Sequence, residues 1–407
     1  MAVKEGSAPG FLGALGHRGY RLLWIGAFVS SVGTWTQDVG LSWLIHSRYR
    51  DPALLGLRSF AAEAPLITFM LVGGAVADRI SRRRILLTSN VIQMLGAVAL
   101  LVLFALDRLG IGPILSLALL TGLAQSQSAP TYQATLTSLV PPSEIPSAVA
   151  LNSLQFNLSR TIGPALAGML LAVAGAGACF GANALSFGAI LVVLFLIPFP
   201  ALAAPAKESL RQSLRNGISH VFRSPALGAM TLLAFAGSCL AFPLITYLPV
   251  VAGESLGTGA AGYAGLLSAL GVGAIVGALF TARRGRAEGR GRFLLLAFSV
   301  YAVVACLALA VRSQASAMAL LAVAGSCLVV GNSTLSSLVQ EHAPPELRGR
   351  VLSVYGVAFR GGSPLGGLLA GLLARHFGAP AVLTVYSLAL LVLTVILLVR
   401  RSTLASL

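Results

Sequence analysis

Apolar runs about 20 residues long recur roughly twelve times along the chain, and short polar connections separate them. A run of this length spans the hydrocarbon core of a bilayer as a helix. Lipid offers no hydrogen bonds to an exposed backbone, so helices are the expected elements. With 57% hydrophobic and 10% charged residues, the chain could not solvate the surface of a soluble protein. The sequence therefore predicts an all-α integral membrane protein with about twelve transmembrane helices.

The limits of the predicted spans follow the polar, glycine and proline residues that interrupt the apolar runs. In chain order the spans are Leu22–Ile45, Leu54–Ala77, Ile85–Leu106, Pro113–Leu139, Ala148–Ala172, Gly181–Phe199, Ala226–Val251, Ala260–Ala282, Phe293–Val311, Ala315–Val339, Val351–Leu373 and Ala379–Val399.

Basic residues are concentrated in alternate connections between these spans. Membrane proteins retain such residues on the cytoplasmic side, so the pattern orients the chain and places both termini in the cytoplasm. The net charge of +16 is thus explained by topology and does not indicate nucleic-acid binding. The basic connections hold Arg18, Arg21, Arg79–Arg84, Lys207, Arg211, Arg215, Arg223, Arg283–Arg292, Arg348, Arg350, Arg400 and Arg401, and the opposite ones hold few: Arg48, Arg50, Arg108, Arg312 and Arg375.

The longest connection divides the chain into residues 1–199, 200–224 and 225–407. Its first part has the composition of a linker, and Leu210, Leu214, Ile218 and Val221 follow at helical spacing. We interpret it as a cytoplasmic tether with a basic amphipathic helix on the inner leaflet. Residues 1–199 and 225–407 are each predicted to form a bundle of about six helices.

The two halves carry a weak internal repeat. Ser153, Arg160 and Pro164 recur as Ser353, Arg360 and Pro364, each 200 residues later. Two related bundles with a site between them are a known design of secondary transporters. The repeat therefore predicts two pseudo-symmetric six-helix bundles.

A short signature follows the second predicted span. Gly74, Asp78, Arg79, Arg82 and Arg83 stand at the spacing of the Gly-x-x-x-Asp-Arg-x-Gly-Arg-Arg motif. This stretch resembles the motif between the second and third helices of the major facilitator superfamily. The resemblance implies that the glycine lets two helices touch, and that the acid and arginines form a gate on the cytoplasmic side.

Three further stretches narrow the resemblance. They are Thr34-Trp-Thr-Gln37, Gly163-Pro164 and Gln340-Glu-His-Ala-Pro-Pro-Glu-Leu-Arg348. Gly163-Pro164 resembles the Gly-Pro motif of the fifth helix in exporters of this superfamily. The other two stretches are similar to the branch that holds enterobactin-type siderophore exporters and macrolide-efflux proteins. The resemblance implies export of a small molecule, such as a drug-like compound or a siderophore-like metabolite.

Charged residues inside the predicted spans are few, and each is a functional candidate because charge is costly in lipid. Asp38 and Glu63 are the acids placed well inside a span. One interpretation makes Asp38 or Glu63 the proton-coupling carboxylate and Arg160 or Arg360 its switching partner. The other makes them permanent ion pairs that position helices. Arg58 is predicted to snorkel toward the outer interface.

Uncharged polar residues inside the spans mark a substrate cavity, because such side chains must face protein or water. The cavity candidates are Trp35, Gln37, Gln125, Gln127, Asn152, Gln155, Asn157, Asn332 and Tyr355.

The predicted function is secondary active transport out of the cell by alternating access, coupled to protons as an antiporter. The lysines, Lys4 and Lys207, lack the context of a phosphate loop, so an ATP-driven pump is disfavoured. The cysteines and histidines lack the spacing of metal ligands. We therefore expect that the protein is not an enzyme and that it binds no metal or cofactor.

Two alternatives remain open at this point. One is an importer or facilitator of a small nutrient or organic anion, and the more remote one is a membrane sensor that does not transport. The expected partners are a small-molecule substrate, protons and membrane lipids, without nucleic acid. The expected location is the bacterial cytoplasmic (inner) membrane, and the expected state is a monomer.

Overall fold

The computed structural model describes residues 12–72, 81–199, 218–284, 289–344, 347–400 and 404, and these residues form helices without a β-strand. The long helices are α1 (Arg18–Tyr49), α2 (Pro52–Val72), α4 (Arg82–Ala105), α5 (Ile111–Ser138), α6 (Ile145–Leu196), α8 (Pro225–Ala241), α10 (Ala260–Arg284), α11 (Arg290–Ala310), α12 (Gln314–His342), α13 (Arg348–Phe377) and α14 (Ala379–Val399). Shorter elements are η1 (Gly13–Gly16), η2 (Pro142–Glu144), α9 (Pro243–Val250) and the π-turn η3 (Val251–Ser255).

The all-helical prediction is confirmed within these ranges. Among the described residues, eight helical segments are long and apolar enough to cross a membrane by length and composition. They include the segment that ends with α6 and the segment that joins α8, α9 and η3. Twelve spans, and termini on the cytoplasmic side, stay predictions.

The helix α6 reverses direction in its middle, where two separate spans were predicted. Gly175 has φ 74° and ψ −172°, a conformation that side-chain-bearing residues rarely adopt. Nothing lies within 4 Å of the position that a Cβ would take there. The predicted connection between Ala172 and Gly181 is therefore reduced to a turn at one glycine.

The predicted span Ala226–Val251 is interrupted after Ala241. Pro243 starts α9 and cannot donate a backbone hydrogen bond to the preceding turn. Ile245 N–H bonds to Phe242 instead, at 2.9 Å, which leaves the carbonyl of Ala241 free. The Tyr301 hydroxyl of α11 donates to that carbonyl at 2.8 Å. The carbonyl left free by the helix break therefore has a hydrogen-bond partner inside the protein.

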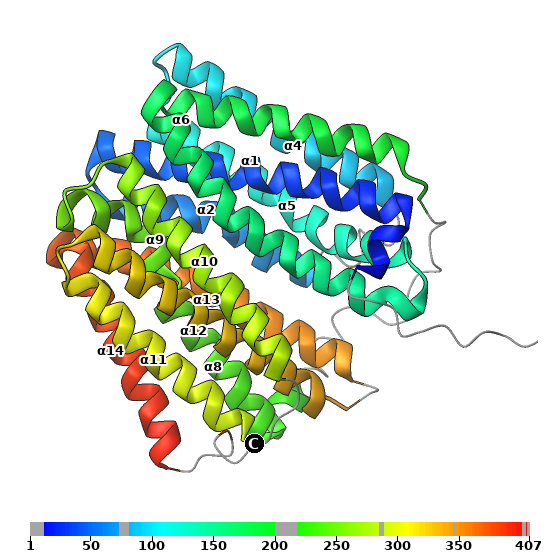
Figure 1. Ribbon diagram of the computed structural model, residues 1–407, viewed down its shortest axis with the longest axis vertical. Coiled ribbons are helices and arrows are strands. Elements are labelled where there is room, and N and C mark those ends of the chain that lie inside the picture. Colours follow the sequence, from blue (N-terminus) through cyan, green and yellow to red (C-terminus); the bar gives the residue numbers. More distant parts are fainter. Residues whose placement is uncertain are drawn as a thin grey trace, which may run out of the picture.

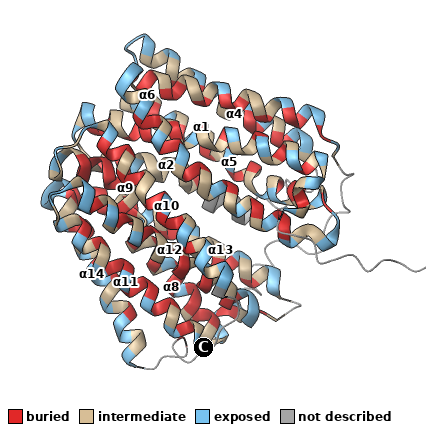
Figure 2. Ribbon diagram, viewed as in Figure 1, coloured by how far each residue is buried: buried red, intermediate tan, exposed pale blue. Residues whose placement is uncertain are grey.

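The helices gather in two groups that lie side by side (Figure 1). The first group holds α1, α2, α4, α5 and α6, and the second holds α8 to α14. The main contacts between the groups join α2 to α13 and α6 to α10. Buried residues lie mostly where helices face one another, and exposed residues lie along the outer sides and ends (Figure 2).

Candidate functional site

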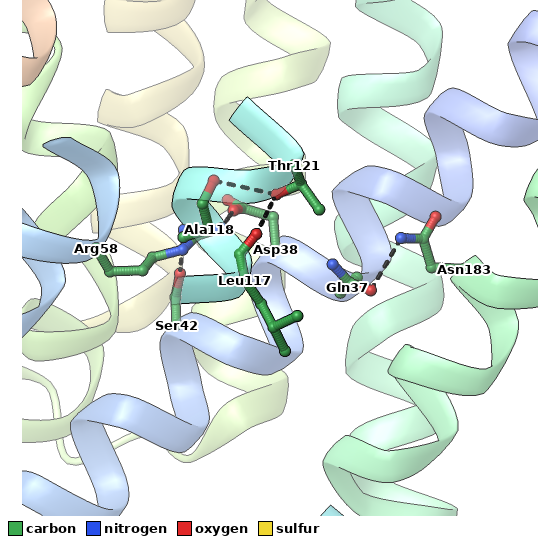
Figure 3. Close-up of polar contacts among 8 residues, drawn as sticks. All are labelled: Gln37, Asp38, Ser42, Arg58, Leu117, Ala118, Thr121 and Asn183. Carbon is green, nitrogen blue, oxygen red and sulfur yellow. Dashed lines mark hydrogen bonds and ion pairs between the residues drawn. The ribbon is translucent and has the colours of Figure 1, made fainter. Parts of the chain in front are cut away.

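The first charged contact inside the protein joins α1 to α2. Arg58 donates through Nη2 to Oδ1 of Asp38, and its Nη1 lies 3.5 Å from the Ser42 hydroxyl (Figure 3). The side chain of Arg58 is 14% exposed and that of Asp38 36%. The prediction that Arg58 snorkels to an interface was therefore wrong. The reason is that α1 brings a carboxylate within reach, which position along the span alone does not show.

Glu63 extends this group across the boundary between the two helix groups. Its carboxyl lies close to Ser363 on α13, and within electrostatic range of Arg58 and Arg360. We call Asp38, Arg58, Glu63 and Arg360 the charge cluster. It holds two acids and two arginines from α1, α2 and α13, so its formal charges balance.

Tyr263 of α10 bounds the charge cluster from another side. Its hydroxyl lies close to Ser42, Asp38 and Arg58. The ring is buried and stacks on Trp43 of α1, with centroids 6.2 Å apart. Side chains of the second helix group thus surround acids and an arginine that the first group supplies.

Arg160 lies apart from this cluster, although the sequence suggested that it pairs with one of the acids. It is 8% exposed, and its guanidinium carbon lies 5.8 Å from the ring centre of Trp35. Its Nε and Nη2 have no hydrogen-bond partner. Of the two predicted switching arginines, the structure brings Arg360 near an acid and leaves Arg160 without one among the ion pairs of the described residues.

Some of the predicted cavity residues bind helices together instead of facing open space. Gln37 accepts a hydrogen bond of 2.9 Å from Asn183, which lies in the part of α6 after Gly175. This contact is on the side away from Asp38 (Figure 3). Gln155 donates to the carbonyl of Ala27 at 3.2 Å and to the Ser31 hydroxyl at 3.0 Å. These amides join α1 to α6. Asn183 was missed, because a single asparagine in a long apolar run gives little signal.

Other predicted cavity residues use their side chains within one helix or on a neighbour. Asn157 donates to Ser153 and Asn332 to Leu328, both one turn earlier in the same helix. Tyr355 is buried and stacks on Phe359 with centroids 6.2 Å apart. The remaining four are exposed or partly buried: Trp35, Gln125, Gln127 and Asn152.

The predicted gate motif lies only partly within the described residues, since Gly74, Asp78 and Arg79 fall outside them. Arg82 donates to the carbonyl of Ala134 at 3.4 Å, and Arg83 lies over the ring of Phe195 at 5.4 Å. The serine that replaces the expected glycine, Ser81, accepts a hydrogen bond from Arg84 N–H. It therefore caps the N-terminus of α4.

A second contact between the groups lies at the end of the molecule that holds the turn between α1 and α2, which we call the distal end. Arg375 of α13 forms a two-pronged ion pair with Asp51, with Nε at 2.8 Å from Oδ1. This hydrogen bond holds the pKa of Asp51 below its usual range. Sequence reasoning missed this pair, because the two residues are 324 positions apart.

Close backbone contact reinforces the distal end. The Tyr247 hydroxyl of α9 donates to the carbonyl of Gly367 at 2.7 Å. A Cβ at Gly56 would lie 2.6 Å from that same carbonyl oxygen, and a Cβ at Gly371 would lie 2.9 Å from the Cα of Ala53. Only glycine lets α2 and α13 approach so closely.

Comparisons with known proteins agree with this architecture. The sequence profile of a family described as transmembrane secretion effector matches residues 10–405. The chain is 22% identical to the staphyloferrin A transporter of Staphylococcus aureus, covering 91% of this chain and 93% of that protein. It is 24% identical to a multidrug efflux pump of Mycolicibacterium fortuitum, with coverages of 92% and 94%. It is 23% identical to the enterobactin exporter of Shigella boydii, with coverages of 94% and 91%.

A solved structure supports the fold at lower identity. A POT family transporter crystallised with a thioalcohol-conjugated peptide superposes with a TM-score of 0.75 at 16% identity, covering 98% of each chain. The predicted resemblance to the exporter branch of the superfamily is confirmed by the family match and by these relatives. The protein is a multi-pass membrane transporter and not an enzyme. The chain belongs to the transmembrane secretion effector family of the major facilitator superfamily.

Proposed function

We propose that this protein is a secondary active exporter of a small molecule, which works by alternating access as a proton antiporter in the bacterial cytoplasmic membrane. The bundles 1–199 and 225–407 move against each other, joined by residues 200–224, with twelve spans and both termini in the cytoplasm. The working unit is a monomer in contact with lipid. The exporters among the relatives support the direction of transport.

The observation that carries this proposal is the nature of the boundary between the two helix groups. Polar contacts join the α1–α2 part of the first group to α13 of the second: Asp51, just before α2, forms an ion pair with Arg375, and Glu63 of α2 lies close to Ser363. Contacts of this kind can be exchanged for water or for other partners at small cost. A boundary built in this way suits two bundles that separate at one end and close at the other.

The charge cluster supports the coupling to protons. Glu63 lies on α2 and Arg360 on α13, so movement of one helix against the other changes the distance between their charges. The proton affinity of Glu63 then differs between the two arrangements of the bundles. That difference is what a proton gradient needs in order to drive the conformational change.

The test uses purified protein in proteoliposomes with an internal pH-sensitive dye. Proton movement is followed after addition of enterobactin, a siderophore, or ethidium, a lipophilic cation. The variants are Asp38→Asn and Glu63→Gln. Asp107→Asn is the matched control, because the Asp107 side chain is 92% exposed and lies outside the charge cluster.

We expect substrate-dependent proton movement in the wild type and in Asp107→Asn, and its loss in at least one cluster variant. The variant that loses coupling identifies the carboxylate that carries the proton. Unchanged coupled transport in both cluster variants would show that the acids are structural. Substrate flux without any dependence on the pH gradient would favour the facilitator.

A further inference from the structure

Arg160 is a buried cation for which the described part of the protein supplies no counter-charge. Its side chain is mostly enclosed, and both Nε and Nη2 lack a hydrogen-bond partner. A charged group in a membrane interior is costly unless it is paired, so an unpaired one marks a function. Arg58, which is partly buried in the same helix group, forms an ion pair with Asp38.

Within the described ranges, the contacts of the Arg160 side chain are with aromatic rings and not with acids. The guanidinium lies over Trp35, and Phe156 meets the Trp35 ring edge-on at 6.2 Å. Tyr301 lies near enough to act on the guanidinium charge, but its hydroxyl is already used by Ala241. The contact with the Trp35 ring stabilises the cation modestly and leaves its N–H donors unused.

The two unpartnered nitrogens lie on the same edge of the guanidinium. Nε–H and the adjacent Nη2–H point in parallel, and such a fork matches the two oxygens of a carboxylate. The unused donors therefore have the geometry of a carboxylate receptor.

The position of Arg160 in the fold fits a substrate site. Thr161, the residue after Arg160 on α6, accepts a hydrogen bond of 3.3 Å at its carbonyl from Ser268 of α10. Arg160 therefore lies beside the boundary between the helix groups. Ser153, Asn157 and Arg160 share one face of α6. Along this face the side chains pass from exposed to partly buried to buried. Polar side chains thus extend along one face of α6 from its start to the arginine, on the side predicted to face the cytoplasm.

We propose that Arg160 binds the carboxylate or a similarly delocalised anionic group of the transported molecule. This inference rests on the proposed function, because both donors are shielded in this arrangement and become reachable when the bundles move. The aromatic rings of Trp35 and Phe156 favour an organic anion with an apolar part. A small, strongly hydrated ion would lose more hydration than one arginine replaces.

The binding test uses full-length protein in neutral detergent, without a membrane or a pH gradient. The probes are 2-naphthoate and its uncharged counterpart 2-naphthamide, and calorimetry measures their affinities. We expect the wild type to bind naphthoate at least tenfold more tightly than naphthamide. Arg160→Gln should lose about tenfold to 100-fold in naphthoate affinity. Arg160→Lys should lose part of it, because lysine keeps the charge without the fork.

Arg108→Gln is the control, since Arg108 is exposed in the turn between α4 and α5. Thermal unfolding without probe adds a second readout: removal of an unneutralised buried charge should raise the unfolding temperature of Arg160→Gln. A merely structural arginine would lower it. If Arg160→Gln does not fold, two measurements still test the anion site. They are the naphthoate affinity of Arg160→Lys and the ratio of naphthoate affinity to naphthamide affinity in the wild type.

Equal affinity for the two probes, or unchanged naphthoate affinity in Arg160→Gln, would overturn the anion site. These outcomes are independent of the transport test. Coupled flux of ethidium without naphthoate binding rejects the anion site alone. Naphthoate binding without coupled flux of any probe rejects the exporter alone.

Discussion

Arg160 and Arg360 occupy equivalent positions in the repeat, 200 residues apart, yet the fold treats them differently. Arg160 is buried, with two donors unused. Arg360 is exposed and lies near Glu63 of the opposite helix group. Among the described residues, Arg360 has an acid within electrostatic range, whereas Arg160 has none among the ion pairs.

Near each arginine, by contrast, a glycine brings two helices into close contact. A Cβ at Gly163 would lie 3.0 Å from the carbonyl oxygen of Val32, so α6 rests on α1 through a glycine. A Cβ at Gly362 would lie 2.9 Å from the backbone nitrogen of Cys239, so α13 rests on α8 in the same way. The two glycines are one position out of register, because the 200-residue repeat places Ser363 opposite Gly163, yet each half brings its helices together through a glycine near the proline.

The largest effect on stability should come from removing the acidic partner of Arg58, which would leave Arg58 unpaired as Arg160 is among the described residues. Asp38→Asn removes the counter-charge of Arg58 and should lower the free energy of unfolding by about 3 kcal/mol, since Asp38 is partly exposed and water screens the pair. The double variant Asp38→Asn/Arg58→Gln should recover most of the loss. Thermal unfolding in detergent measures both. A double variant no more stable than Asp38→Asn would contradict this account.

The shared packing predicts equal sensitivity at the two glycines. Gly163→Val and Gly362→Val should each destabilise the protein by about 2 kcal/mol, because a larger side chain meets the backbone of the facing helix. Size-exclusion chromatography should show less monodisperse protein. Gly188→Val is the control, since nothing lies within 4 Å of its Cβ position. A large difference between the two glycine variants would mean that the two helix contacts are not equally tight.

The halves differ again at the break after α8, which has no counterpart in the continuous helix α1. Tyr301→Phe leaves the carbonyl of Ala241 without its hydrogen bond and should cost about 1 kcal/mol. Tyr20→Phe, which removes a hydroxyl bonded to Ala148 at 2.9 Å, is a matched control with an expected cost of the same size. Only Tyr301→Phe should also alter transport, because Tyr301 supports the broken helix. Equal transport in both variants would assign the break a structural role alone.

The smallest effect should come from the exposed ion pair at the distal end. Because Arg375 holds the pKa of Asp51 below its usual range, the pair stabilises the folded protein above about pH 4, and this is lost as the pH falls through that lowered value. Asp51→Asn should therefore lower the unfolding temperature slightly at pH 7 and not at strongly acidic pH. High salt should remove the difference. The Asp38–Arg58 pair should respond less to salt.

Much of the fold follows from the spacing of apolar runs, because lipid permits few alternatives to the helix. Pro243 indicated the helix break in the sequence, since proline inside a helix removes a hydrogen bond. The break was not predicted, because the apolar run continues past Pro243. The site was harder to predict. Asp38, Glu63 and Arg360 were recognisable as costly charges, whereas the pairing of Asp38 with Arg58 depends on how α1 and α2 are rotated. Local sequence contains little information about that rotation.

The unneutralised charge of Arg160 has an electrical consequence. A charge that crosses the whole membrane potential gains or loses about 2.3 kcal/mol per 100 mV, and a partial displacement contributes in proportion. If Arg160 changes its depth in the field as the bundles move, the empty carrier transfers charge, while a carrier loaded with a monovalent anion does not. Membrane voltage would then act mainly on the return of the empty protein. A membrane potential imposed with potassium and valinomycin should change the turnover rate of the wild type. The rate of a single transport step with the anion bound should not change.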